Sequence, residues 1–209
     1  MCPAGNNWPK QIRAVGAYTI EGKNICTGTM LNNTKGDRTP YFLSANHCGV
    51  NTGNDDTVEV YWNYQKINPT CNTNQFSHGP GILTDNQSGS LFRASYAQSD
   101  FLLLELSQKP DSGFNVFYAG WDTTGTGSFS PVGIHHPWLE VKAISSSTTS
   151  PTTTMYNSSS SDPLGNHWRV VWNSGVTEKG SSGSCLFDSW RHRVSLSVKR
   201  KRPLRRASP

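Results

Sequence analysis

The sequence is poor in charged residues, in helix-favouring residues and in long apolar runs. Charged residues make up only 16% of the 209 residues, while aromatic residues make up 11% and include seven Trp. Disordered chains have the opposite balance, so intrinsic disorder is excluded. No run approaches the roughly 18 apolar residues of a membrane-spanning helix. No CxxC pair points to a zinc or redox site.

The residues that are plentiful are those of strands and turns. Gly, Ser, Thr and Asn are abundant, which is typical of short strands joined by tight turns. A chain of this length suits one all-β domain or a pair of small barrels. The expected strands lie at 12–20, 41–45, 58–64, 101–106 and 168–172. The Ser/Thr-rich stretches at 145–154 and 157–161 are expected to be surface loops, with a flexible linker as the alternative.

The cysteines favour disulfide bonds formed in an oxidising compartment, with free buried thiols in a cytosolic protein as the alternative. There are five, an odd number, so at least one thiol has no partner within the chain. Residues 1–5 lack the charged start and apolar run of a signal peptide. That absence is usual in cytosolic proteins, but it also occurs where a sequence begins at or inside the mature domain.

The net charge of +5 is concentrated at one end. Residues 190–209 contain eight Lys/Arg and no Asp/Glu, and the remaining 11 basic and 14 acidic residues give residues 1–189 a net charge of −3. The body of the chain therefore has no electrostatic reason to bind nucleic acid. Any such binding would depend on this basic tail.

Three short motifs contain the residue types of a hydrolase. His47 ends an apolar strand and precedes Cys48, and Asp100 enters the most apolar run of the sequence, at 101–106. A carboxylate in such a place needs a partner, because burying it unpaired costs several kcal/mol. Ser182 lies in a Gly/Ser-rich stretch, where small neighbours let backbone N–H groups converge on one oxygen.

Each motif alone has an ordinary structural explanation: a surface or core histidine, an aspartate that caps a turn, and a flexible loop. Their order along the chain is His, Asp, Ser. That order matches the chymotrypsin arrangement and differs from those of subtilisin and the α/β-hydrolases. Together the motifs indicate a charge-relay site.

Longer motifs around these residues resemble the bacterial lysyl endopeptidases, which are chymotrypsin/trypsin-like serine proteases. The motifs lie at 26–34, 41–48, 99–106, 119–122, 133–137 and 175–184, within a resemblance that covers about residues 2–188. The resemblance implies an all-β protein of two antiparallel six-stranded β-barrels. Residues 1–110 would form the first barrel, which carries His47 and Asp100. Residues 111–189 would form the second, which carries Ser182, with the site in the cleft between them.

The same resemblance implies the role of each site residue. Ser182 would be the nucleophile, His47 the general base, and Asp100 the residue that orients the imidazole. The backbone N–H groups of Gly180 and Ser182 would form the oxyanion hole. Ser181 and Ser184 are rival serines, and the resemblance favours Ser182. It also implies a secreted monomer that cleaves proteins or peptides after lysine and uses no metal or organic cofactor.

The resemblance further implies two disulfide pairs, Cys26 with Cys48 and Cys2 with Cys71. The residues alone leave fifteen ways to choose two bridges from five cysteines. Cys185 stands where the family motif has proline, and it receives no partner.

The resemblance ends after Ser189. We expect the second barrel to be incomplete, because the last strands and the acidic residue that recognises lysine have no match in 190–209. We interpret this segment as the product of a frameshift or truncated gene, with a genuine basic tail as the alternative. The alternative function is a catalytically inactive protease homologue whose tail binds nucleic acid, an anionic lipid surface or an acidic partner.

Overall fold

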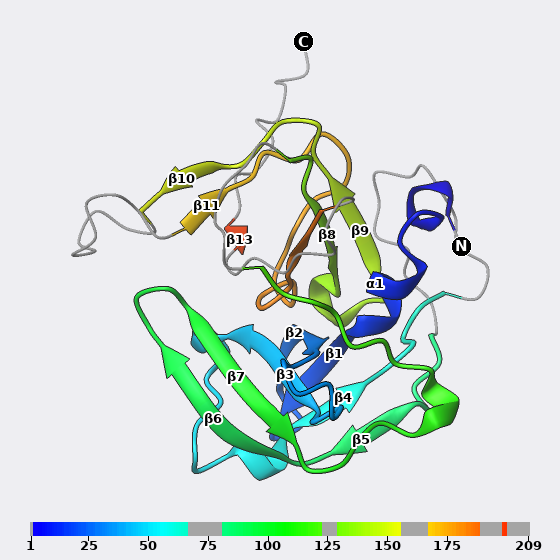
Figure 1. Cartoon of the computed structure of the whole chain (residues 1–209), viewed down its shortest axis with the longest axis vertical. Helices are drawn as coiled ribbons and strands as arrows, with labels where there is room; N and C mark the ends of the chain where they lie inside the picture. Colours follow the sequence, from blue (N-terminus) through cyan, green and yellow to red (C-terminus); the bar gives the residue numbers. More distant parts are fainter. Residues whose placement is uncertain (1, 67–80, 123–128, 156–166, 189–197, 200–209) are drawn as a thin grey trace.

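The structure, a computed structural model, describes residues 2–66, 81–122, 129–155, 167–188 and 198–199. In this part of the chain it is nearly all-β, as predicted (Figure 1). The helices are α1 (Pro9–Ala14) and the single-turn 3₁₀ helices η1 (Pro3–Gly5), η2 (Asn46–Cys48), η3 (Asp55–Thr57), η4 (Ser112–Phe114) and η5 (Pro137–Leu139). None of these described helices is long and apolar enough to cross a membrane.

Seven strands form one antiparallel sheet, in the lower part of Figure 1. In chain order they are β1 (Val15–Ile20), β2 (Asn24–Leu31), β3 (Tyr41–Ala45), β4 (Glu59–Tyr61), β5 (Asn86–Ser88), β6 (Ser90–Tyr96) and β7 (Phe101–Leu106). Across the sheet their order is β5-β4-β1-β2-β3-β7-β6. All of them lie within residues 15–106.

The two edges of this sheet belong to one continuous chain segment. β5 pairs with β4 at one edge, β6 pairs with β7 at the other, and only Gly89 separates β5 from β6. Gly89 has a φ of +88°, and a Cβ there would lie 2.7 Å from the hydroxyl of Ser107. A glycine is therefore required at this bend. Segment 86–96 acts as one bent strand that curls the sheet round, so the seven strands follow a six-stranded barrel path.

The inside of the curled sheet is filled by aromatic and aliphatic side chains. Tyr18 and Trp62 each pack edge-on against the ring of Phe42. Strand β7 alternates, with Leu102, Leu104 and Leu106 in this core, and its other face packs against a second apolar cluster. Both faces of β7 are therefore covered, as its continuous apolar sequence predicts.

Two three-stranded sheets lie above the curled sheet in Figure 1. One contains β8 (Val132–His135), β9 (Ala143–Ser146) and β12 (Leu186–Phe187) in the order β12-β8-β9. The other contains β10 (Thr152–Thr154), β11 (His167–Arg169) and β13 (Val198–Lys199) in the order β10-β11-β13. β13 is parallel to β11, whereas the other pairs are antiparallel.

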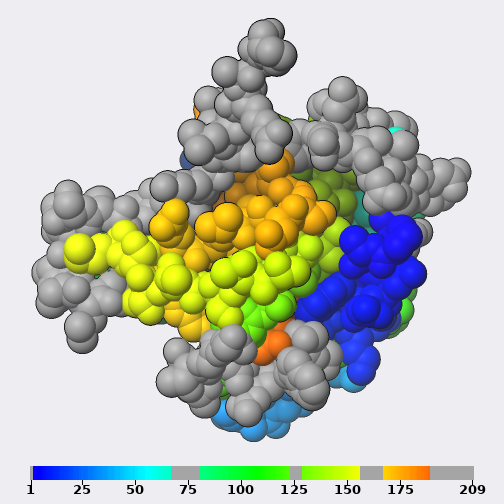
Figure 2. Space-filling view, turned by 90° about the horizontal axis from the view of Figure 1, so that it is seen from above, coloured from blue at the N-terminus to red at the C-terminus, as the bar shows by residue number. Residues whose placement is uncertain are grey.

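One apolar cluster joins the upper and lower parts of the molecule. It contains Trp8 and Ile12 of the N-terminal segment, Leu43 of β3, and Ile134 and Phe187 of the upper sheet. Figure 2 shows the N-terminal residues, in blue, lying against the yellow-green residues of the upper sheets. The two parts therefore share a packed core, although the expected boundary between residues 110 and 111 stays a prediction.

The strand predictions at 41–45 and 101–106 are confirmed by β3 and β7. The prediction at 12–20 is wrong for residues 12–14, which end helix α1. Pro9 begins that helix with its φ already set, and Ile12 and Ala14 are buried by it. The strands expected at 58–64 and 168–172 are shorter: β4 ends at Tyr61, two residues before Asn63 with a φ of +52°, and β11 ends at Arg169.

The loop prediction at 145–154 is also wrong in part. Residues 145 and 146 complete β9, and β10 (Thr152–Thr154) pairs with β11. Three consecutive β-branched threonines suit a strand, whereas their polarity suggested a loop. The stretch at 157–161 lies outside the described residues.

Candidate active site

His47 and Asp100 come from two paired strands. β3 and β7 are antiparallel with Ala45 opposite Phe101, so the residues just beyond this pair meet at the same end of the two strands. His47 lies in η2, directly after β3, and Asp100 immediately precedes β7. The Asn46 N–H donates to the Asp100 carbonyl at 2.9 Å and continues the ladder by one step.

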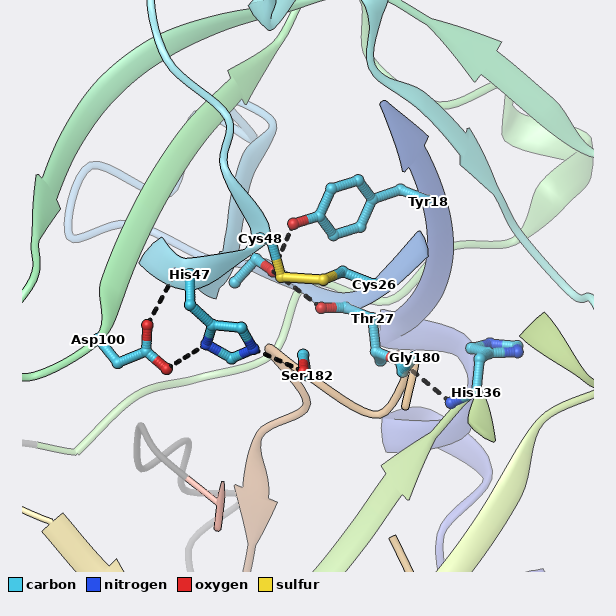
Figure 3. Close-up of a disulfide and its surroundings, with 10 residues drawn as sticks. Tyr18, Cys26, Thr27, His47, Cys48, Asp100, His136, Gly180 and Ser182 are labelled. Carbon is cyan, nitrogen blue, oxygen red and sulfur yellow. Dashed lines mark hydrogen bonds and ion pairs between the residues drawn. A yellow bond between two sulfur atoms is a disulfide. The ribbon is translucent and has the colours of Figure 1, made fainter. Parts of the chain in front are cut away.

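The carboxylate of Asp100 contacts His47 twice. Oδ1 accepts the backbone N–H of His47 at 2.8 Å, and Oδ2 lies 2.6 Å from Nδ1 of the ring (Figure 3). Burial raises the pKa of Asp100, but the hydrogen bonds from His47 outweigh it, so the pKa lies below its usual value. Ionised Asp100 only accepts hydrogen bonds, so Nδ1 carries the proton.

His47 also contacts Ser182. Its Nε2 lies 2.6 Å from the Ser182 Oγ. With the proton on Nδ1, Nε2 of the neutral ring has a free lone pair, so the Ser182 hydroxyl donates to it. The His47 side chain is 49% exposed and that of Asp100 is 14% exposed. The imidazole is therefore half-exposed to solvent, while the carboxylate behind it is largely covered.

Glycines on either side of Ser182 shape its loop. Gly180 has a φ of +87°, and a Cβ there would lie 2.7 Å from the His136 carbonyl oxygen. Gly183 has a φ of +83°, and its Cβ would meet the Ser44 side chain and the Thr27 carbonyl. A larger residue at either position would displace the loop, because backbone atoms block the space.

The carbonyl groups of residues 178–182 all accept hydrogen bonds. Thr27 donates from its hydroxyl to the Gly180 oxygen at 2.7 Å and from its N–H to the Ser182 oxygen at 2.8 Å. Among the described residues, the N–H groups of Gly180 and Ser182 have no acceptor. The loop therefore has two N–H donors available next to the serine hydroxyl.

The rival serines do not lie at His47. The Ser181 hydroxyl lies 2.8 Å from Nδ1 of buried His135 and accepts the N–H of Glu178. The Ser184 hydroxyl is buried, and the described residues offer it no hydrogen-bond partner. Of the three candidate serines, the structure brings only Ser182 to the imidazole.

The cysteines agree with the expected pairing where the structure describes them. Cys26 of β2 and Cys48 of η2 form a disulfide, with their Cα atoms 6.3 Å apart. The predicted pair of Cys2 and Cys71 cannot be placed, because Cys71 lies outside the described residues. Cys185 is a free, buried cysteine, and burial raises the pKa of its thiol to about 12.

Sequence reasoning missed the polar residues behind the site. Thr27 lies in the motif at 26–34, and the buried His135 and His136 lie in the motif at 133–137, but the sequence alone assigns a role to none of them. The only signal was the conjunction of Thr27 with a disulfide-forming cysteine, and its contacts span 153 residues of sequence. Such distant contacts are invisible to local patterns.

Comparisons with known proteins point to one family. The sequence model described as "Lysyl endopeptidase, C-terminal domain" matches residues 1–197. A lysyl endopeptidase of Pseudomonas aeruginosa strain PAO1 is 34% identical over 168 residues, which are 79% of this chain and 34% of that protein. The chain thus spans about a third of the length of that relative. The family match runs past Ser189, where the motif resemblance ends.

Solved structures share the fold at low identity. A thermostable serine protease, AL20, from an extremophilic microorganism superposes with a TM-score of 0.55 at 10% identity, over 90% of this chain and 84% of that chain. A protease of M. tuberculosis in its active form gives 0.53 at 14% identity, over 92% and 73%. These likenesses show the fold. The alternative of an inactive homologue with a binding tail gains no support from any of these comparisons.

Proposed function

Because the chain belongs to the lysyl endopeptidase C-terminal domain family, we propose that it is a serine endopeptidase, which hydrolyses peptide bonds through an acyl-enzyme on Ser182. The observation that carries the proposal is the continuous hydrogen-bonded series from Ser182 through His47 to Asp100. The expected order of nucleophile, base and orienting acid has the geometry that this chemistry requires.

In the first step the Ser182 Oγ attacks the carbonyl carbon of the scissile bond, and its proton passes to Nε2 of His47. Asp100 remains ionised and stabilises the imidazolium. The tetrahedral intermediate collapses as the C–N bond breaks, and His47 returns the proton to the leaving amine. Water, deprotonated by His47, then attacks the ester carbonyl. The acid product leaves and Ser182 recovers its proton.

The negative oxygen of both tetrahedral intermediates needs donors. We propose that the N–H groups of Gly180 and Ser182 supply them, because both are unengaged and lie on either side of Ser181 in a loop whose carbonyls are held elsewhere. One donor of this kind contributes roughly 3 kcal/mol to the transition state. The carbonyl groups of residues 179–181 are already hydrogen-bonded, and these bonds would limit how far the two donors reorient during the reaction.

We propose proteins or peptides as substrates, with cleavage after lysine, and a secreted monomer as the working form. Lysine preference is carried by the family membership and by the name of the P. aeruginosa relative. Secretion is supported by the disulfide between Cys26 and Cys48. Matched peptide substrates that differ only in Lys, Arg or Leu before the scissile bond test the preference, and equal kcat/KM values would contradict it.

The function itself is tested by covalent labelling with a fluorophosphonate, which reacts with activated serines. The wild-type chain should be labelled, Ser182→Ala should not, and Ser184→Ala should be labelled like the wild type. Ser184 is the matched control because its hydroxyl lies two residues away and has no partner among the described residues. A folded wild-type chain without labelling, or labelling that survives Ser182→Ala, would refute the proposal.

A further inference from the structure

Thr27 lies where the curled sheet meets the Ser182 loop. It belongs to β2 and is fully buried. Its neighbour Cys26 forms the disulfide with Cys48, the residue next to His47 (Figure 3). Two consecutive residues of one strand therefore contact the segment that carries the base and the segment that carries the nucleophile.

The Thr27 hydroxyl makes two hydrogen bonds at once. It donates to the Gly180 oxygen at 2.7 Å and accepts the His136 N–H at 3.0 Å, and both partners are buried. A hydroxyl is the side-chain group that gives one proton and accepts another at such short reach. Valine has the same shape but would leave a buried acceptor and a buried donor unpaired.

The backbone of Thr27 is held just as firmly. Its N–H donates to the backbone carbonyl oxygen of Ser182 at 2.8 Å, and its carbonyl accepts the Ser44 hydroxyl at 2.9 Å. Since the single proton of Ser44 goes to Thr27, the hydroxyl of Tyr18 donates to Ser44, at 2.8 Å. Every polar atom of Thr27 therefore has a partner, and the series runs from the barrel core to the Ser182 loop.

The peptide that Thr27 holds lies between the two proposed oxyanion donors. Gly180 N–H belongs to the peptide before it, whose Lys179 carbonyl accepts from Trp138 N–H. Ser182 N–H belongs to the peptide after it, whose Ser181 carbonyl accepts from Ser184 N–H. The middle carbonyl, that of Gly180, accepts from the Thr27 side chain. A rotation of this middle peptide would turn both N–H groups relative to each other.

We propose that Thr27 is a positioning residue that keeps the two oxyanion-hole N–H groups convergent, through its hydroxyl bond to the Gly180 carbonyl. The inference rests on the proposed serine endopeptidase function. Thr27 is fully buried, and its hydrogen bonds do not involve the reacting atoms, Ser182 Oγ and His47 Nε2. Its effect falls on the transition state, because the two N–H groups are needed most when the carbonyl oxygen becomes negative.

The test compares wild type, Thr27→Val, Thr27→Ser and Thr29→Val. Thr29 lies on the same strand and is equally buried, but its hydroxyl makes no hydrogen bond to the Ser182 loop. Steady-state kinetics use a peptidyl-lysine aminomethylcoumarin amide, and inhibition uses the peptide aldehyde of the same sequence, whose adduct with serine is tetrahedral. Circular dichroism and thermal melting verify that each variant is folded.

We expect Thr27→Val to lower kcat about tenfold or more, short of the roughly 100- to 1,000-fold loss when a donor itself is removed. KM should stay within about twofold, and aldehyde affinity should fall in proportion to kcat/KM. Thr27→Ser should restore kcat, and Thr29→Val should match the wild type. If Thr27→Val does not fold, Thr27→Ala replaces it, because Thr27→Ser and Thr27→Ala differ in the hydroxyl alone.

A wild-type kcat in the hydroxyl-free variant, or an equal loss in Thr27→Ser, would overturn the inference while leaving the endopeptidase proposal intact. A wild-type chain that neither hydrolyses the peptide nor reacts with the fluorophosphonate would overturn both. A rise in KM with unchanged kcat would also overturn the inference, since it would place Thr27 in substrate binding.

Discussion

The two halves of the candidate site are held in different ways. His47 and Asp100, which we call the His–Asp pair, extend from adjacent strands of one sheet, so the β3–β7 ladder sets their spacing. Ser182 lies in a loop, the nucleophile loop (residues 178–184), which accepts two hydrogen bonds from Thr27 and one from Trp138 and is closed by one from Ser184 to Ser181 within the loop. The strand ladder is held by many hydrogen bonds, so the loss of one disturbs it little, whereas the loop depends on a few. Single substitutions in the loop should therefore disturb the geometry more.

The largest expected effect nevertheless concerns the His–Asp pair, because the substitution Asp100→Asn removes a charge and leaves the geometry unchanged. In Asp100→Asn the amide NH₂ would donate to Nδ1, so the ring proton would move to Nε2. That tautomer cannot accept the Ser182 proton, and we expect kcat to fall about 10⁴-fold. Stopped-assay kinetics on the peptidyl-lysine substrate would measure it, with Asn46→Ala as a nearby control. A kcat within tenfold of wild type would show that Asp100 does not set the tautomer.

Next in size is Gly180→Ala, which tests the loop. The new methyl would meet the His136 carbonyl at 2.7 Å in a left-handed backbone, so the loop must shift and carry the proposed oxyanion donor with it. We expect a 100- to 1,000-fold loss of kcat, on the order of losing one donor. Gly22→Ala is the matched control: its φ is +67°, yet no atom lies within 4 Å of the added methyl. It should lose about 1 kcal/mol of stability and no activity.

Equal kcat losses in Gly180→Ala and Gly22→Ala would erase the contrast between loop and ladder. They would mean that left-handed strain anywhere is enough to impair the site.

A middle-sized effect is expected from removing the disulfide in the double variant Cys26→Ser, Cys48→Ser. The bond closes a segment with a sequence separation of 22, so its loss should lower the free energy of unfolding by about 3 kcal/mol in the chain-entropy model. kcat should fall far less than in Gly180→Ala, since the β3–β7 ladder still holds the His–Asp pair. Urea denaturation and kinetics measure both quantities, with Cys185→Ala as the control without a disulfide. A kcat loss above 100-fold would show that the ladder alone is insufficient.

The sequence predicted the surroundings of the His–Asp pair better than those of the nucleophile loop, for a physical reason. The strands at 41–45 and 101–106 can be predicted from their apolar composition. His47 and Asp100 stand at the ends of these segments, so the local sequence predicts which strand each of the two residues adjoins. The His–Asp–Ser order then identifies Ser182. The contacts that hold Ser182 come from Thr27 and Trp138, far away in sequence, and no local pattern encodes them.

The smallest expected effect distinguishes the two halves by pH. Behind the nucleophile loop, His135 is fully buried, and burial lowers the pKa of its imidazole to about 4. Ser145 gives its proton to the Val176 carbonyl, so His135 donates from Nε2 to Ser145 and accepts from Ser181 at Nδ1. Only the neutral ring fits this pattern. The His–Asp pair has no buried imidazole, since His47 is half-exposed.

The sign follows from proton binding. Between about pH 4 and 6.5 the unfolded chain binds a proton at His135 that the folded chain does not, so stability falls as the pH falls through this window. From about pH 7 to 5.5 this group alone should remove about 1 kcal/mol. Urea denaturation across the window measures the slope, which should be shallower in His135→Asn even if that variant is less stable throughout. A slope that stays unchanged in His135→Asn would instead assign the pH sensitivity to other titratable groups.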